Sequence, residues 1–239
     1  MKHGSKANAE LLRDLVAANH ILYREGVLDG FGHVSARDDR NAARFFLSRS
    51  IAPGNVRVRD IMEFDLEGEP TAPGGRKPYV ERFIHSEIYR LRPDVQAIVH
   101  SHSPSVIPYG VTGTPLRPVC HMSAFLGEAT PIFEIREAGG PATDMLVRDR
   151  RLGAALAKAL GGATFALMRG HGSVAVGGSI RQVVYRAIYA EVNARLQSEA
   201  SRLGEITFLN EREAANAAVA NDAVIDRPWA LWTSRLRNR

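Results

Sequence analysis

Apolar residues recur at helical spacing in two stretches of the chain. Near the N-terminus this spacing predicts an amphipathic helix over residues 8–25, which Gly26 ends. The longest helix is predicted to begin at Ser179, because Gln182 follows three residues later in a capping-box pattern, and to end at Gly204. The apolar positions concerned are Leu11, Leu12, Leu15, Val16 and Leu22 in the first helix and Val184, Ile188, Val192 and Leu196 in the second.

Shorter apolar runs, bounded by turn residues, predict strands and two further helices. The strands are expected at 45–48, 95–102, 164–168 and 173–176, and the short helices at 81–91 and 152–160. The first of these helices ends at Arg92, because a residue that precedes proline disfavours the helical region. The alternation of strands and helices predicts one α/β domain over residues 1–239, with a C-terminal tail at about 205–239 that Trp229 and Trp232 anchor.

Composition is typical of a globular enzyme. Of 239 residues, 45% are hydrophobic and 24% charged. The single cysteine, Cys120, excludes an intramolecular disulfide and a cysteine-based zinc site, and we interpret it as an inert buried thiol. No apolar run approaches the ~18 residues of a membrane span, and the N-terminus lacks the apolar core of a signal peptide. We therefore expect a cytoplasmic protein that does not bind membranes.

The net charge of +5 and the pI of about 9.6 raise the question of nucleic-acid binding. The basic residues are scattered, however, and the densest group, Arg235 to Arg239, is interpreted as a solvated chain end. No RNA-binding aromatic signature or helix-turn-helix pattern is present. Positive charge equally suits a small anionic substrate, which is the partner that we expect in place of nucleic acid.

Three histidines give the strongest chemical signal in the sequence. His100 and His102 are two apart on a predicted strand, so their side chains project from the same face. His171 lies between two glycines in a turn that follows another strand, where a side chain is freely presented. Three imidazoles that leave an open coordination position are typical of a catalytic metal site. Such a site accepts Mn²⁺ or Zn²⁺, with Co²⁺ or Fe²⁺ as further candidates, and one ion per subunit is expected.

The segments GHVSAR, RKPYVERFIHSEIYRLRPDVQAIVHSHS and LMRGHGSVAVG resemble the class II aldolase/adducin family, and the resemblance runs from the first helix to about Leu203. The resemblance implies a three-layer α/β/α fold around a mainly antiparallel sheet and a homotetramer with active sites between subunits. It also implies that His100, His102 and His171 are metal ligands. Glu81 is implied as the catalytic acid/base that can also approach the metal, although a carboxylate at a helix start is favoured by the helix dipole alone.

Two departures from the sugar-phosphate aldolases of this family bear on the substrate. Those enzymes bind phosphate with a Gly-Asn pair and a Ser-Ser pair, and this chain has Gly32-His33 and Tyr79-Val80 instead. Val80 offers no hydroxyl for a phosphate, whereas Tyr79 offers a flat ring and His33 can donate to a substrate carboxylate. We therefore assign Tyr79 and His33 to substrate binding and expect a planar, carboxylated substrate.

The remaining candidates leave alternatives open. His121 is either a core histidine or, at about the position of a tyrosine thought to protonate the aldolase product, a proton donor. Arg37 and Arg49 are candidates for binding a substrate carboxylate, since arginine binds carboxylates in bidentate fashion, but surface arginines are common. Arg82 and Arg169 lie close in sequence to site elements, and we interpret His20 and His85 as structural or surface residues of helices.

These observations favour a metal-dependent decarboxylase, a C–C lyase, acting on a hydroxylated aromatic or pyridine dicarboxylate in a catabolic pathway. The alternative is an aldolase or epimerase that acts on a sugar derivative with the same metal. A non-catalytic interaction domain, like the adducin head, is disfavoured because a pure scaffold does not require Glu81 and the three histidines.

Overall fold

The computed structural model describes residues 9–237. A seven-stranded sheet lies at its centre, in the order β3-β2-β1-β4-β7-β6-β5. Every neighbouring pair is antiparallel except β5 and β6, which are parallel. The strands are β1 (His33–Asp38), β2 (Asn41–Ser48), β3 (Ile61–Asp65), β4 (Ala97–Ser101), β5 (Ile132–Phe133), β6 (Phe165–Met168) and β7 (Gly172–Gly177).

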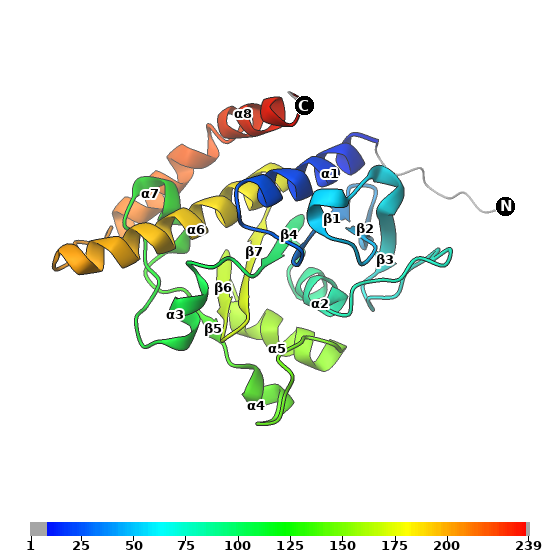
Figure 1. Cartoon of the computed structure of the whole chain (residues 1–239), viewed down its shortest axis with the longest axis horizontal. Coiled ribbons are helices and arrows are strands. Elements are labelled where there is room, and N and C mark those ends of the chain that lie inside the picture. The colour runs from blue at the N-terminus through cyan, green and yellow to red at the C-terminus, as the bar shows by residue number, and fades with distance from the viewer. Residues whose placement is uncertain (1–8, 238–239) are drawn as a thin grey trace.

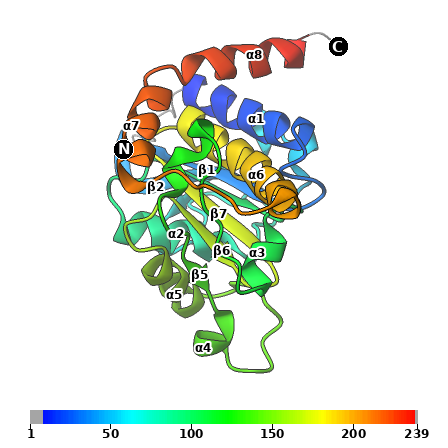
Figure 2. The ribbon, with the colours of Figure 1, turned by 90° about the vertical axis from the view of Figure 1, so that its left-hand side faces the viewer.

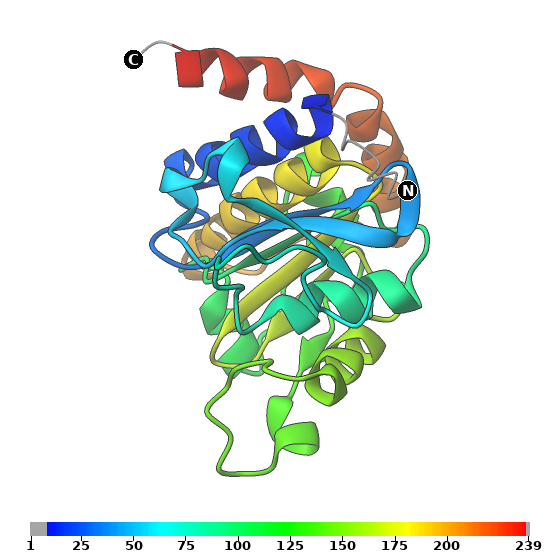
Figure 3. The same ribbon diagram turned by 90° about the vertical axis from the view of Figure 1, so that its right-hand side faces the viewer.

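Helices cover both faces of this sheet, so the expected three-layer α/β/α fold with a mainly antiparallel sheet is confirmed (Figures 1 and 2). Helices α1, α6 and α8 lie on one side of the sheet, and α2 and α5 lie on the other (Figure 3). The α-helices are α1 (Ala9–Arg24), α2 (Arg82–Leu91), α3 (Ile107–Val111), α4 (Ile135–Gly139), α5 (Arg150–Leu160), α6 (Ile180–Leu203), α7 (Glu211–Asp222) and α8 (Asp226–Arg237). No helix within residues 9–237 is long and apolar enough to cross a membrane.

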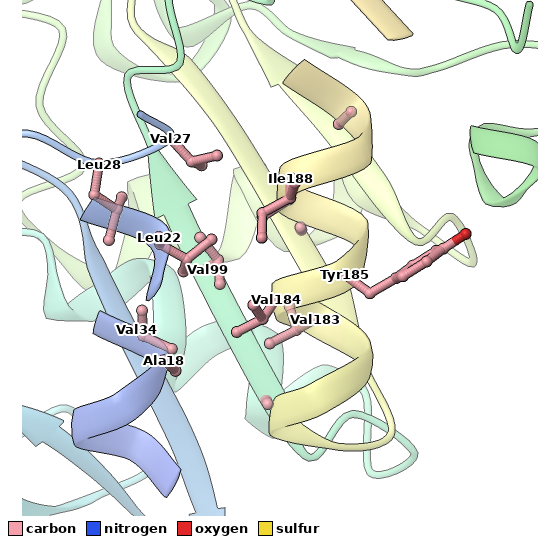
Figure 4. Close-up of a cluster of buried hydrophobic side chains, with 14 of the residues drawn as sticks. Ala18, Leu22, Val27, Leu28, Val34, Val99, Val183, Val184, Tyr185 and Ile188 are labelled. Carbon is pink, nitrogen blue, oxygen red and sulfur yellow. The ribbon is translucent and has the colours of Figure 1, made fainter. Parts of the chain in front are cut away.

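The core is divided between the two faces of the sheet because side chains alternate along each strand. Val34 of β1 and Val99 of β4 point to the side of α1 and α6, where they meet Leu22 and Val184 (Figure 4). Ile98 belongs to the second core, under α2 and α5. The polar residues that alternate with the first set, such as His33 and His100, therefore face the α2 side of the sheet.

The C-terminal segment is more regular than expected. Residues predicted as a tail form α7 and α8, and Trp229 and Trp232 are buried in the core cluster that also contains α1 residues. The basic end of the chain is helical as far as Arg237, and Arg235 is exposed, as expected, and pairs with Glu25 at 3.4 Å. Residues 1–8, which bear on the signal-peptide expectation, and residues 238–239 lie outside the described part of the chain.

Candidate metal centre and active site

Two neighbouring strands and one turn position the three histidines. His100 is in β4, and His102 follows the end of that strand. His171 lies in the turn between β6 and β7, and β7 pairs with β4. This turn passes so close to β4 that a Cβ atom on Gly172 would lie 2.1 Å from the carbonyl oxygen of Ser101, which explains why glycine follows the histidine.

The ligand atoms of the three histidines converge. The Nε2 atom of His102 lies 3.1 Å from that of His100 and 3.0 Å from that of His171. With Glu81, these residues place four potential ligand atoms within 4.8 Å of one another. Tetrahedral Zn²⁺ with Zn–N bonds of about 2.0–2.1 Å separates its ligand nitrogens by roughly 3.3 Å. The donor set and its spacing thus fit a divalent metal ion.

The neutral tautomer of His100 leaves one ring nitrogen available for a metal. Its Nδ1–H donates to the carbonyl of Ser173 at 3.1 Å, which leaves the Nε2 lone pair directed at the cluster. Burial lowers the pKa values of both His100 and His102, and the neighbouring histidines add to this shift. Neutral imidazole is the form that binds a metal, so no proton has to be displaced from these two rings at neutral pH.

Glu81 completes the cluster from the start of α2. It is the residue that immediately precedes α2, and its Oε2 lies 3.7 Å from Nε2 of His100 and 3.6 Å from Nε2 of His171. Its other oxygen accepts a hydrogen bond from the amide of Val147 at 2.9 Å. Burial raises the pKa of the Glu81 carboxyl, whereas His171 and the Val147 amide act in the opposite direction. This carboxylate is held in place and is suited to ligation or proton transfer.

The cluster opens onto a pocket of about 320 Å³. Glu81 and His102 form one side of it, and much of the remaining wall is aromatic or aliphatic. The apolar side chains in this wall are Phe31, Ile51, Ala52, Tyr79, Val80 and Leu146. Phe31 is 68% exposed, and its ring centroid lies 6.1 Å from that of His102. None of the residues that line this pocket is arginine or lysine.

The two residues expected to bind substrate, His33 and Tyr79, both line this pocket. Their ring centroids are 4.6 Å apart, and the His33 ring lies 5.0 Å from that of His100. The Tyr79 hydroxyl donates to the carbonyl of Ile51 and is thus already engaged. Tyr79 therefore offers its ring to the pocket, whereas His33 retains a free ring nitrogen.

Arg37 does not fit the substrate-binding role expected for it. Its side chain is buried and donates to the backbone carbonyls of Val95, Ala42, Tyr89 and Arg92 at 2.6–3.0 Å. All three of its side-chain nitrogens thus tie β1 to β2, to α2 and to the segment that follows α2. We correct its assignment to a structural residue.

The other arginines are also paired away from the cluster. Arg49 donates to Asp60 at 2.7 Å and lines a separate cavity, although Ile51 borders both cavities. Arg82 donates to the carbonyl of Gly68 at 2.6 Å, and Arg169 pairs with Glu134 at 2.6 Å. None of these three arginines lines the pocket within one chain.

His121 is separated from the cluster within one chain. It is exposed at the start of a 3-10 helix (His121–Leu126) and lines a different cavity with Cys120 and residues of α7. The prediction that it acts as a proton donor therefore requires a neighbouring subunit. Cys120 is half-buried, and its Sγ contacts Ser123 Oγ at 3.3 Å, with no basic group among its hydrogen-bond partners.

Sequence reasoning missed Phe31 and Leu146 at the pocket and misjudged His85. His85 is fully buried and hydrogen-bonded to His33, so it belongs to the surroundings of the site. A signal for it was present, because His85 and Tyr89 are four apart on a helix and His33 and Ser35 are two apart on a strand. No comparable signal marks Phe31, which lies in a glycine-rich loop.

Comparisons with known proteins found a matching family, similar sequences and a similar fold. The Class II Aldolase and Adducin N-terminal domain matches residues 13–198. The decarboxylase tropJ of Talaromyces stipitatus is 40% identical, covering 92% of each chain. A 3,4-dihydroxyphthalate decarboxylase of Arthrobacter keyseri is 33% identical over 80% of this chain and 79% of its own. In fold, an L-fuculose 1-phosphate aldolase superposes with a TM-score of 0.78 at 23% identity, covering 92% of this chain and 100% of its own.

Proposed function

The chain belongs to the class II aldolase and adducin family, and from this premise we propose that it is a metal-dependent decarboxylase of a hydroxylated aromatic or pyridine dicarboxylate. One observation carries the proposal: the Glu81 and histidine cluster opens onto a pocket with an aromatic and aliphatic wall. Phe31, Tyr79 and Val80 suit the faces of a planar ring. The residues that line this pocket include no arginine or lysine to neutralise a phosphate dianion.

The names of the relatives support the same reaction class. The two most similar of those described above are both named decarboxylases, and one is named for 3,4-dihydroxyphthalate, a ring that carries adjacent hydroxyl and carboxylate groups. A substrate of this kind could direct its hydroxyl and carboxylate oxygens at the cluster while its ring lies along Phe31 and Tyr79.

His100, His102 and His171 would hold the divalent ion, Mn²⁺ or Zn²⁺ being the first candidates. When bound, the ion supplies a Lewis acid that stabilises negative charge on substrate oxygens. In the reaction the bond between the ring carbon and the carboxylate breaks, CO₂ leaves, and the electron pair stays on the ring carbon. A proton donated by Glu81, or by His121 of a neighbouring subunit, then completes the C–H bond. The donor afterwards regains a proton from water.

Assembly is part of the proposal. We infer a homotetramer in which His121 of one subunit reaches the pocket of the next. His121 and the cluster line different cavities of one chain, so His121 can act on the substrate only if a neighbouring subunit supplies it. A small anionic substrate is the expected partner, and neither nucleic acid nor membrane is.

An aldolase or epimerase of a sugar derivative is the second candidate, since the cluster would serve that chemistry equally well and the fold matches an L-fuculose 1-phosphate aldolase. A non-catalytic role is disfavoured by the intact four-residue cluster. The test is to incubate metal-loaded enzyme with hydroxylated aromatic dicarboxylates and with sugar phosphates, and to follow CO₂ and aldehyde. Release of CO₂ alone is expected. Aldehyde from a sugar phosphate, without decarboxylation of any ring acid, would establish the aldolase instead.

A further inference from the structure

Four polar side chains lie buried between the sheet and α2, behind the wall of the pocket. His33 and Ser35 project from β1, and His85 and Tyr89 project from α2. All four are at most 3% exposed. Residues two apart on a strand share a face, as do residues four apart on a helix, so the two pairs face each other along their lengths.

These side chains form one continuous hydrogen-bonded series. Nδ1 of His33 lies 2.6 Å from Nε2 of His85, and Nδ1 of His85 lies 2.6 Å from Oγ of Ser35. Oγ of Ser35 lies 2.8 Å from the hydroxyl of Tyr89. The series therefore starts at the pocket, which His33 lines, and ends inside the protein at Tyr89.

An imidazole that accepts a hydrogen bond at one ring nitrogen carries its hydrogen on the other nitrogen and is neutral. Burial lowers the pKa of His85 to about 3, which agrees with an acceptor nitrogen in that ring. Burial also raises the pKa of the Tyr89 hydroxyl, which therefore keeps its proton. Each imidazole thus carries a single N–H, and the position of that hydrogen depends on the direction of the hydrogen bonds.

Only one direction satisfies every donor. Among the described residues the Tyr89 hydroxyl has no hydrogen-bond partner except Ser35, so Tyr89 must donate to Ser35. Ser35 then donates to Nδ1 of His85, and Nε2–H of His85 donates to Nδ1 of His33. In the opposite direction the Tyr89 O–H would be buried without an acceptor, which proteins avoid. The hydrogen of His33 is consequently on Nε2.

We propose that Tyr89, Ser35 and His85 are positioning residues that hold His33 as the tautomer protonated at Nε2, so that it presents a fixed N–H donor to an anionic oxygen of the substrate. Among the described residues Nε2 of His33 makes no hydrogen bond, and its ring borders the pocket. The role of His33 as a donor rests on the proposed function, in which the substrate is a ring dicarboxylate. The tautomer itself does not depend on that function.

The fixed tautomer also explains why His33 stays outside the ligand cluster, although its ring centroid is 5.0 Å from that of His100. A nitrogen that carries a hydrogen has no lone pair for a metal, and the other nitrogen accepts from His85. His33 is thereby kept as a hydrogen-bond donor next to three histidines whose geometry suits ligation. The hydrogen-bonded series thus allows histidines of one site to serve two purposes, ligation of a metal and donation of a hydrogen bond.

The first test measures the tautomer directly, by neutron diffraction or by NMR of ring-¹⁵N-labelled histidine in the metal-free and zinc-loaded protein. Wild type is expected to show His33 and His85 both protonated at Nε2. Ser35→Ala removes the donor to His85 and should produce a mixture of tautomers at His33. Ser86→Ala is the matched control, because Ser86 is equally buried on α2 but its hydroxyl has no hydrogen-bond partner among residues 9–237. His33 protonated at Nδ1 in wild type would overturn the proposal.

The second test separates positioning from general structural damage. Ser35→Ala is expected to lower kcat/KM about tenfold, mainly through KM, with metal content unchanged. In a His33→Gln background the side-chain amide supplies an N–H whatever its neighbours do, so adding Ser35→Ala should change kcat/KM by less than about twofold. An equal loss in both backgrounds would show that Ser35 acts only through the fold and would overturn the proposal. If no ring acid is turned over, the proposed function fails, and the tautomer measurement still decides this inference.

Discussion

The Nε2 atoms of His102 and His171 lie 3.0 Å apart, although 69 residues separate the two histidines in the chain. Two neutral imidazole nitrogens at this distance repel each other unless a hydrogen or a cation lies between their lone pairs. Nε2 of His100 lies 3.1 Å from the same atom of His102, and Oε2 of Glu81 faces the group. A single hydrogen cannot serve three nitrogens, whereas one divalent cation can.

Metal binding should therefore depend on each of these histidines. His102→Ala is expected to lose most of the bound metal together with most of the activity, because two remaining imidazoles and one carboxylate leave a much weaker site. Metal content is measured by elemental analysis after gentle purification. His20→Gln serves as the control, since His20 bonds to the carbonyl of Val56 outside the cluster. Wild-type protein with well under one metal per chain, which added metal does not activate, would contradict the assignment.

Glu81→Gln separates metal binding from proton transfer. The amide keeps the shape of the side chain and can still accept from the Val147 amide, but it cannot exchange a proton. We expect kcat to fall by about 10²- to 10⁴-fold while metal remains bound by the histidines. The exposed Glu137→Gln is the control. Loss of metal from the Glu81 variant would instead make the carboxylate primarily a ligand.

The convergence of the three histidines could be predicted from sequence because it follows from local rules, whereas the role of Glu81 was inferred mainly from the family resemblance. Alternation along β4 places His100 and His102 near one another, and the glycines around His171 mark a turn that can approach a neighbouring strand. Both rules depend on a few residues of known spacing. The long helix and its cap were predictable for the same reason.

Strand β1 could not be predicted from the sequence, because its alternate residues are polar. In β1 the residues His33, Ser35 and Arg37 are polar, so the segment does not show the apolar run of a buried strand, yet it is buried at every position. Its polar side chains are satisfied by α2 and by backbone carbonyls, which are distant in sequence. Helix α7, in contrast, had local signals that were overlooked, because its alanines favour a helix and Asn210 and Glu213 form a capping box at its start.

Phe31 should contribute to substrate binding through its ring. It is 68% exposed at the mouth of the pocket, and a stacked aromatic pair contributes about 0.5–1.5 kcal/mol beyond buried area. Phe31→Ala is therefore expected to raise KM for a ring substrate by roughly 2- to 10-fold, with metal content unchanged. Phe31→Leu retains apolar area without the aromatic face and should give a smaller effect. Unchanged KM in both variants would exclude a contact between Phe31 and the substrate.

Arg37→Met should affect stability and leave substrate affinity unchanged. It removes four hydrogen bonds to backbone carbonyls around β1, and we expect a loss of about 2–4 kcal/mol in the free energy of unfolding. Arg37→Lys should recover only part of this loss, because an ammonium cannot reproduce the fork of the guanidinium. Chemical denaturation measures the change. A raised KM with unchanged stability would restore Arg37 to the substrate site.

The shared active site can be tested by mixing subunits that are each inactive alone. Glu81→Gln removes the acid/base of one pocket, and His121→Ala removes the imidazole that lines a different cavity of the same chain. If each site combines Glu81 of one subunit with His121 of its neighbour, random mixed tetramers contain native sites at roughly a quarter of positions and recover activity in proportion. Light scattering checks that both variants remain tetrameric, and each variant dissociated and reassembled alone is the control. If His121→Ala is itself fully active, His121 is not the proton donor, and Glu81 alone carries that step. If both variants are inactive and mixing restores nothing, the two residues do not meet between subunits.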